Sequence, residues 1–273
     1  MAHSERNSRA LGPQIRLTGA PWLFGLIVFG AFLAANEGGL WLGQTSQLTA
    51  DQVARAQRIA VEESVLAILA LLLAFSLVMA VTRFDSRRLL AVEEANAIGT
   101  SYWRCLLVPP PEGPELLDLL KEYVDAKVHF FDSGIDVERL RASRERTIQL
   151  QNEMWTRAAV HAKNDPRSIP AGLLLESLNQ TFDLENSRWM ALTVHLPVGV
   201  LGVDFLVALL AGLLVGYNFG LDGYRDRIST WVLATCVAAV LGVVLDLDQP
   251  RRGLIQVGAR PLIDLHRQLE ETQ

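Results

Sequence analysis

The sequence predicts an all-α integral membrane protein with four transmembrane helices and a helical cytosolic segment. Half of the 273 residues are apolar, and the mean hydropathy is +0.23. Four nearly uncharged stretches, each at least 18 residues long, lie at 17–35, 64–82, 191–217 and 228–245. About 20 helical residues cross the hydrocarbon core of a bilayer, so each stretch is long enough to form a span. The alternative, four buried helices of a soluble domain, is disfavoured because such helices seldom run this far without a polar face.

The first stretch, 17–35, follows several arginines, as the core of a signal peptide would. A cleavage site needs small residues in a small-x-small pattern, and bulky residues stand two positions before each alanine at the end of this stretch. We therefore expect a retained first span, with an alternative end at residue 43. An outer loop and helix over 44–63 then lead into the second span at 64–82.

The distribution of Lys and Arg predicts the orientation. The two connections at 36–63 and 220–227 carry only two arginines each, whereas the N-terminal segment, 83–190 and the tail carry the remainder. Cytosolic loops carry an excess of basic residues. The sequence thus predicts a multi-pass protein of the cell membrane (inner or plasma membrane), with both termini in the cytosol.

The cytosolic segment at 83–190 is expected to be helical throughout. Leu117, Leu120, Val124 and Val128 recur at helical spacing after a break of three prolines. A second helix is expected over 136–161. A third carries Leu175, Leu178, Phe182 and Trp189 on one stripe and is predicted to run directly into the third span at 191–217.

Two acidic residues lie within predicted spans, Asp204 near the middle of the third and Glu37 toward the outer end of the first. A carboxylate at the bilayer centre costs about 2.5–3.5 kcal/mol, so Asp204 is expected to face the protein interior or water. An ion-pathway residue and an interhelical hydrogen bond are open alternatives for Asp204. Glu37 is either part of an outer mouth or an ordinary interfacial residue. Close helix packing is expected along a row of small residues that continues from Asp204 at four-residue spacing: Ala208, Gly212, Gly216 and Gly220.

Signatures of enzymes and cofactor sites are missing from the sequence. It has no metalloprotease helix motif, phosphate loop or nucleophile elbow, and only two cysteines. Asp204 and Asp246 do not suit an aspartyl dyad, because Asp246 lies at the membrane edge. With a net charge of −5, the chain also lacks a global basic field for nucleic acid. We expect no enzyme, no metal, no cofactor and no nucleic-acid partner.

Two motifs resemble a known family. The second span continues without a break into Arg83-Phe84-Asp85-Ser86-Arg87-Arg88, which resembles the bestrophins. The stretch Glu93-Glu94-Ala95-Asn96-Ala97-Ile98-Gly99-Thr100 is similar to the bacterial and plant bestrophin-like family, as is Asp246-Leu247-Asp248-Gln249-Pro250-Arg251-Arg252-Gly253 after the fourth span. The resemblance covers about residues 60 to 260. It implies a single bestrophin-like membrane domain over 1–273, ending in a cytosolic tail at 246–273.

The resemblance implies a homo-oligomer in the lipid bilayer, with a pentamer as the expected form, that passes monovalent ions. In bestrophins the second spans surround the pore and supply three apolar rings, which correspond to Ala67, Leu71 and Phe75 in this sequence. Apolar rings gate a pore by dewetting. Phe75 and Leu71 suit that role, whereas the methyl group of Ala67 would leave the pore wide at its level.

The second motif departs from the eukaryotic bestrophins, which bind calcium with a dense acidic run after the fourth span. Only Asp246 and Asp248 stand at this place, and calcium takes six to eight oxygen ligands. We therefore expect no calcium clasp but a tight turn. Its charged residues are expected to pair at the membrane edge with Arg83, Arg87, Arg88, Glu93 or Glu94, and Arg88 with Asp248 is the pair to test by charge reversal.

The leading functional prediction is a passive ion channel lined by the second span. The alternative is a non-conducting membrane sensor or scaffold whose cytosolic helices bind a partner. A coupled transporter that uses Asp204 as a proton site is a third possibility. Ion selectivity stays open, because Glu93 in a vestibule would favour cations and the arginines beneath the second span would favour anions.

Overall fold

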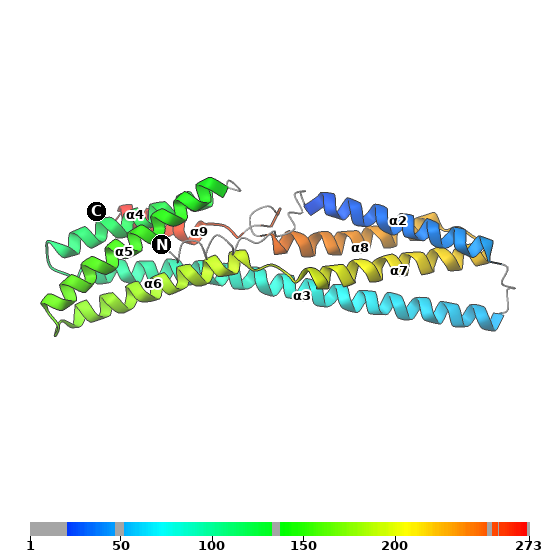
Figure 1. Ribbon diagram of the computed structural model, residues 1–273, viewed down its shortest axis with the longest axis horizontal. Coiled ribbons are helices and arrows are strands. Elements are labelled where there is room, and N and C mark those ends of the chain that lie inside the picture. The colour runs from blue at the N-terminus through cyan, green and yellow to red at the C-terminus, as the bar shows by residue number, and fades with distance from the viewer. Residues whose placement is uncertain (1–20, 47–51, 133–136, 250–252, 256, 272–273) are drawn as a thin grey trace, which may run out of the picture. The chain divides into compact units, whose positions relative to one another are not determined.

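A computed structural model describes residues 21–46, 52–132, 137–249, 253–255 and 257–271. The described residues form helices joined by short connections (Figure 1). They belong to two compact units. The first unit comprises 1–65 and 207–242, and the second comprises 66–206 and 243–273.

Four helical segments are long and apolar enough to cross a membrane, so the predicted class is confirmed. They contain α2 (Pro21–Thr45), α3 (Gln52–Cys105), α7 (Val198–Asp222) and α8 (Arg227–Asp248). The 54 residues of α3 extend over roughly 80 Å at 1.5 Å per residue, far more than the ~30 Å of the hydrocarbon core. This helix therefore continues well beyond the bilayer.

In the first unit, glycines bring α2 and α7 into backbone contact. A Cβ atom added to Gly212, Gly216 or Gly220 of α7 would meet the backbone of α2 at Phe32, Asn36 or Leu40, respectively. The side chain of Asn36 adds a hydrogen bond, donated by Nδ2 to the carbonyl oxygen of Gly212 over 3.1 Å. The close packing expected along the small-residue row is confirmed for these three glycines.

We expect Gly216→Ala to destabilise the first unit, because its new methyl group would collide with the backbone of Asn36. Overpacking of this kind costs about 1–3 kcal/mol. Gly242→Ala, in α8, is the matched control, since nothing lies within 4 Å of its added Cβ. Thermal unfolding of the purified protein should show a lower midpoint for Gly216→Ala and an unchanged or higher one for Gly242→Ala. Equal midpoints would contradict the close approach of α2 and α7.

The second unit packs the later part of α3 with four further helices (Figure 1). These are α4 (Glu112–Asp132), α5 (Val137–Asn164), α6 (Ile169–Thr193) and α9 (Arg260–Glu271). Direct contacts join α4 to α5, α5 to α6 and α4 to α9. The fully buried side chains of the core come from all five helices and include Ile98, Leu120, Leu150, Leu174 and Leu262.

One prediction about this unit is wrong: the third cytosolic helix does not run directly into the third span. The helix α6 ends at Thr193, residues 194–197 are not helical, and α7 begins at Val198. Pro197 explains the break, since its ring clashes with the carbonyl group four residues earlier and disfavours a helical conformation of the preceding residue. The carbonyl groups released at this break become acceptors for an arginine of α3, described below.

Candidate functional site

The predicted neck residues lie on a face of α3 that the described residues leave uncovered. Leu71 is 55% exposed and Phe75 is 60% exposed, and Ala67 is exposed as well. The opposite face of the same helix is buried within the chain and carries Leu69, Leu73, Ser76 and Ala80. The helical period thus separates an inward face from an outward one that is available to a pore, to another subunit or to lipid.

Further along α3 the outward face carries polar residues beside the exposed Leu89. Thr82, Ser86 and Glu93 are exposed. At 100° per residue they fall within about 20° of the direction of Phe75. Both hydroxyl groups donate to the helix backbone, Thr82 to the carbonyl of Val78 and Ser86 to that of Thr82, so their oxygen atoms remain as acceptors on this face.

Asp204 forms a hydrogen bond between two helices next to the neck residues. Ser76, which follows Phe75 in the sequence, donates its hydroxyl to Oδ2 of Asp204 over 2.5 Å, and both residues are buried. The other oxygen, Oδ1, has no hydrogen-bond partner among the described residues. Of the two alternatives for Asp204, this geometry favours the interhelical hydrogen bond. Glu37, in the first unit, is exposed and pairs with Arg225.

Because the contact with Ser76 needs an acceptor and not a charge, Asp204→Asn should retain it and Asp204→Leu should lose it. Loss of the acceptor would leave the buried hydroxyl of Ser76 unsatisfied, at a cost of about 1–3 kcal/mol. Thermal unfolding should show similar midpoints for the wild type and Asp204→Asn, and a lower midpoint for Asp204→Leu. A transporter that uses Asp204 as its proton site would instead lose pH-driven uptake in Asp204→Asn, whatever the stability of that variant.

The motif after the second span contains two buried charged residues, Arg87 and Glu94, and a set of outward residues; Glu94 is described with the charged cluster below. Arg87 is only 2% exposed and donates three hydrogen bonds to backbone carbonyl oxygens, of Ala191 at 2.9 Å, Val194 at 3.0 Å and Leu247 at 3.1 Å. It therefore binds the break between α6 and α7 to the end of α8. The other motif residues beneath the span are exposed or partly buried: Arg83, Phe84, Asp85, Arg88, Glu93 and Asn96.

The two carboxylates of the motif after the fourth span, Asp246 and Asp248, accept hydrogen bonds from backbone N–H groups near the same junction. Oδ1 of Asp248 accepts the N–H of Leu196 at 2.9 Å and lies 3.9 Å from Nη2 of Arg87. Asp246 accepts the N–H groups of Leu254 at 2.8 Å and Ile255 at 2.9 Å. Gly253 packs directly on Asp246, where a Cβ atom would collide. Pro250 lies outside the described residues.

The expected pairing of the two motifs is found between Arg87 and Asp248, and not at Arg88, which was the pair chosen for charge reversal. Adjacent residues of a helix point about 100° apart, so only one of two successive arginines can reach this junction. Arg88 is exposed. The sequence placed both arginines beneath the span without separating their directions.

Arg87→Lys should destabilise the protein, whereas Arg88→Lys should not. A lysine carries the same charge but lacks the planar fork that reaches three carbonyl oxygens at once. Each buried acceptor left unsatisfied costs about 1–3 kcal/mol. Thermal unfolding of the two variants provides the measurement. Equal unfolding midpoints for Arg87→Lys and Arg88→Lys would show that Arg87 contributes only its charge.

A buried cluster of charged side chains joins α3, α4 and α6. Glu94 of α3 lies 2.8 Å from Nζ of Lys127 and 2.5 Å from Nη1 of Arg188. Glu185 lies 3.5 Å from the same Lys127 nitrogen. None of these four residues is more than 6% exposed. Charged residues are almost never buried to this extent unless they are paired.

Sequence reasoning found Glu94 through its motif and missed Lys127, Glu185 and Arg188. A signal was present in α6, because Glu185 stands three residues after Phe182 and four before Trp189 on an otherwise apolar stripe. A carboxylate at such a position has to find a buried cation.

Tyr123 of α4 lies beside the charged cluster and is fully buried. Burial, together with the nearby Glu94 and Glu185, raises the pKa of the Tyr123 phenol well above its usual range. Gln151 donates a hydrogen bond to the phenol oxygen over 3.4 Å. Tyr123 thus stays neutral, and the charges of the cluster come from its carboxylates, lysine and arginines.

Comparison with known proteins identifies the family of this fold. A profile of the Bestrophin-like domain matches residues 31–262. The chain belongs to the Bestrophin-like family. No curated protein matches this bestrophin-like chain.

Among solved structures, the bestrophin-like chain is similar to two single-residue variants of a bacterial bestrophin homolog from Klebsiella pneumoniae. For one variant the TM-score is 0.66 at 14% identity, with 92% of this chain and 99% of that chain covered. For the other the TM-score is 0.63 at 15% identity, with 91% and 97% covered. A crystal structure described as a membrane protein gives a TM-score of 0.65 at 15% identity, with 91% and 96% covered. At these identities the likeness establishes the fold alone.

Proposed function

We propose that this bestrophin-like protein is the subunit of a passive ion channel, and that α3 lines its pore with a neck at Leu71 and Phe75. The observation that carries the proposal is the outward face of α3. It presents large apolar side chains at Leu71 and Phe75 and then polar ones at Thr82, Ser86 and Glu93.

Leu71 and Phe75 lie within the predicted span at 64–82, where an exposed apolar face suits a pore neck as well as lipid. Ser86 and Glu93 lie beyond that span, where their surroundings are aqueous with or without a pore, so they are compatible with a vestibule but do not by themselves favour it. In a pore, rings of Leu71 and Phe75 would form a narrow section that excludes water and ions when closed. Thr82, Ser86 and Glu93 would line a wider, hydrated vestibule. Such a pore requires a homo-oligomer, for which the family resemblance suggests a pentamer.

The test is ion current through the purified protein in a planar lipid bilayer, under a KCl gradient. We expect discrete currents, and their reversal potential gives the sign of the permeant ion. The mass of the detergent-solubilised assembly, measured on the same preparation, gives the number of subunits. A folded oligomer that passes no current would contradict a constitutive channel.

One observation favours a second function, that of a membrane-anchored scaffold. The end of α3 and the turn after it expose Trp103, Leu106 and Leu107, of which Trp103 is 60% exposed. Exposed apolar residues that lie together mark binding sites for other proteins. A scaffold would pass no current in the bilayer recordings, whereas a channel would, so the same preparations separate the two functions. The Trp103→Ser variant should fold normally, because this side chain is exposed.

A further inference from the structure

The carboxyl group of Asp204 is buried inside a membrane-spanning helix with only one of its oxygen atoms in a hydrogen bond. Asp204 is 1% exposed, and its Oδ2 atom contacts the hydroxyl group of Ser76, which is also 1% exposed. The other oxygen, Oδ1, is buried and has no hydrogen-bond partner among the described residues. The contact with Ser76 therefore accounts for one oxygen atom and leaves the charge of the side chain without an obvious compensation.

The apolar parts of the four membrane-spanning helices contain no cation that could pair with Asp204. Lys, Arg and His do not occur in 21–45, 64–82, 198–222 and 228–245. Every subunit of a homo-oligomer has the same sequence, so a neighbouring copy cannot supply a cation from these segments either. The other titratable side chains of these segments do not carry a positive charge: Glu37, Tyr217, Asp222 and Cys236.

On α3, which contacts Asp204 through Ser76, the nearest charged residues lie well away along the helix. At 1.5 Å per residue, Glu63 precedes Ser76 by about 20 Å and Arg83 follows it by about 10 Å. Among the residues that the structure describes, Asp204 has no salt-bridge partner, Arg83 included. The helix α3 thus supplies a hydroxyl group to Asp204 but no charge.

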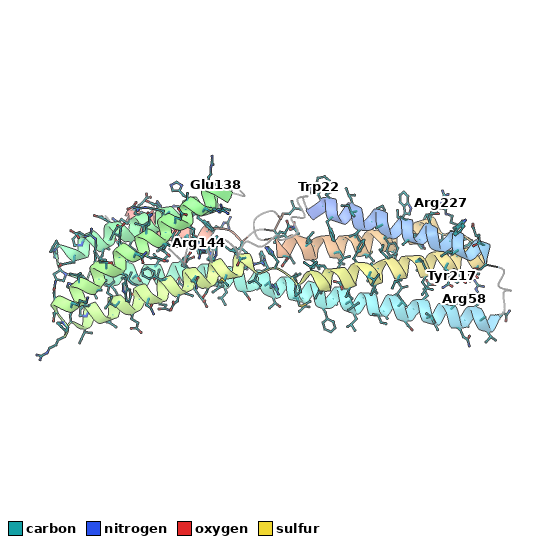
Figure 2. The ribbon with its side chains drawn as sticks, viewed as in Figure 1. Trp22, Arg58, Glu138, Arg144, Tyr217 and Arg227 are labelled. Atoms are coloured by element: carbon teal, nitrogen blue, oxygen red, sulfur yellow. The ribbon has the colours of Figure 1, made fainter. Side chains whose placement is uncertain are left out.

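The basic residues that flank the other apolar segments have different positions and partners. His195 precedes α7, and its Nδ1 atom lies 3.3 Å from Oδ2 of Asp248. In the first unit, Arg58 of α3 and Arg227 of α8 lie toward the end opposite to Trp22, which begins the described part of α2 (Figure 2). These cations mark the ends of the apolar segments and do not enter them.

Neither the helix dipole nor a metal ion provides a better compensation. A helix N-terminus stabilises acidic side chains within its first turn, whereas Asp204 is the seventh residue of α7. Hard cations such as Ca²⁺ and Mg²⁺ take about six or more oxygen ligands. Within the described part of the chain, no group of three or more acidic, histidine or cysteine side chains is placed to hold a metal ion.

We propose that Asp204 is a proton-binding site: in the folded protein at neutral pH it is a neutral carboxylic acid, with the proton on Oδ1 and the hydrogen bond from Ser76 on Oδ2. A buried carboxylate without a counter-ion takes up a proton, because burial of an unpaired charge costs far more free energy than burial of a neutral polar group. Glu94 is buried as deeply but contacts two cations, so the same reasoning leaves it ionised.

A neutral Asp204 leaves no fixed charge beside the neck residues, since its partner Ser76 directly follows Phe75 in the sequence. The proton site itself does not depend on whether the protein conducts ions.

Infrared spectroscopy of the purified protein at neutral pH tests the proposal. The carbonyl stretching band of a protonated carboxylic acid is separate from the bands of ionised carboxylates and of the backbone. We expect this band in the wild type and its loss in Asp204→Asn. Asp222→Asn is the matched control and should retain the band, since Asp222 lies on the same helix and pairs with Arg55. Arg83→Gln should retain it as well, because the nearest cation of α3 does not compensate Asp204.

Ser76→Ala keeps the test decisive if Asp204→Asn does not fold. It removes the hydrogen-bond donor to Oδ2 but leaves the carboxyl group in place. The band should therefore persist and move to higher frequency, as a carbonyl group does when its oxygen loses a hydrogen bond. Ser177→Ala is the control, because Ser177 is equally buried but donates to the carbonyl oxygen of Leu174, so the band should not move.

Three results would overturn the proposal. One is the absence of the band from the folded wild type at neutral pH, which would mean that Asp204 is ionised. Another is a band of the same intensity and frequency in the wild type, Asp204→Asn and Ser76→Ala, which would assign the proton to a different side chain. The last is a band that appears in the wild type only when alkali metal ions are replaced by an organic cation, which would show that a metal ion and not a proton neutralises Asp204.

Discussion

Phe75→Ala should enlarge the current through the protein several-fold or hold the pore open. The phenyl ring of Phe75 is 60% exposed and lies on the outward face of α3, where the oligomer would bring copies of it together. Truncation of the phenyl ring to a methyl group widens the narrowest apolar section of the pore. It thereby lowers the energy barrier to ion passage through a neck that excludes water. Since Phe75 makes little contact with its own chain, the variant should fold and assemble as the wild type does. Single-channel recording in planar bilayers measures the effect.

Leu206→Ala is the matched control for this prediction. Leu206 is also a large, exposed apolar residue of a membrane-spanning helix, but it lies on α7. Its truncation should leave the unitary current unchanged. Phe75→Ala currents of wild-type size, from an assembly of normal mass, would rule out a neck at this residue. They would leave open a pore that narrows elsewhere along α3.

Glu94→Gln should cause the largest loss of stability of any single substitution considered above. Glu94 is buried and is the one carboxylate in contact with both Lys127 and Arg188. Glutamine keeps the shape of the side chain but removes its charge, so two buried cations would share the remaining carboxylate of Glu185. Breaking a buried ion pair in this way costs about 3–5 kcal/mol. Denaturant unfolding followed by tryptophan fluorescence should show the loss, with the same slope and a much lower midpoint.

An exposed ion pair of the same helical region gives the control for Glu94→Gln. Glu115 of α4 pairs with Arg157 of α5, and both side chains are about half exposed. Solvent screening reduces such a pair to roughly 0–1 kcal/mol, so Glu115→Gln should be nearly neutral. If Glu94→Gln were equally mild, the buried cluster would have to be hydrated or flexible, contrary to its low exposure.

Much of the fold follows from local properties of the sequence. The four spans are visible because hydrocarbon requires long apolar helices, and this requirement acts on each segment separately. The glycines of α7 were recognised from their four-residue spacing, which places them on one side of the helix. The two motifs identified the family, since short runs of residues in a fixed order carry that information.

Errors arose where one helix meets another or ends. The third cytosolic helix was expected to run directly into the third span, but residues 194–197 separate α6 from α7. Several charged residues beneath the second span were candidate partners of Asp248, and the direction of α3 in the second unit gives that position to Arg87 and not to the neighbouring Arg88. Both outcomes depend on the neighbouring elements, which a reading of one segment at a time does not include.

By itself the sequence determined the all-α membrane class, its spans and its family, because these depend on composition, periodicity and short motifs. Only the tertiary structure decided which charged residues are buried together. Lys127, Glu185 and Arg188 lie on helices far from Glu94 in the sequence. The energy of a charge depends on its distance from other charges and on its exposure to water. Those quantities are set by packing, so the charged cluster became visible only in the folded chain.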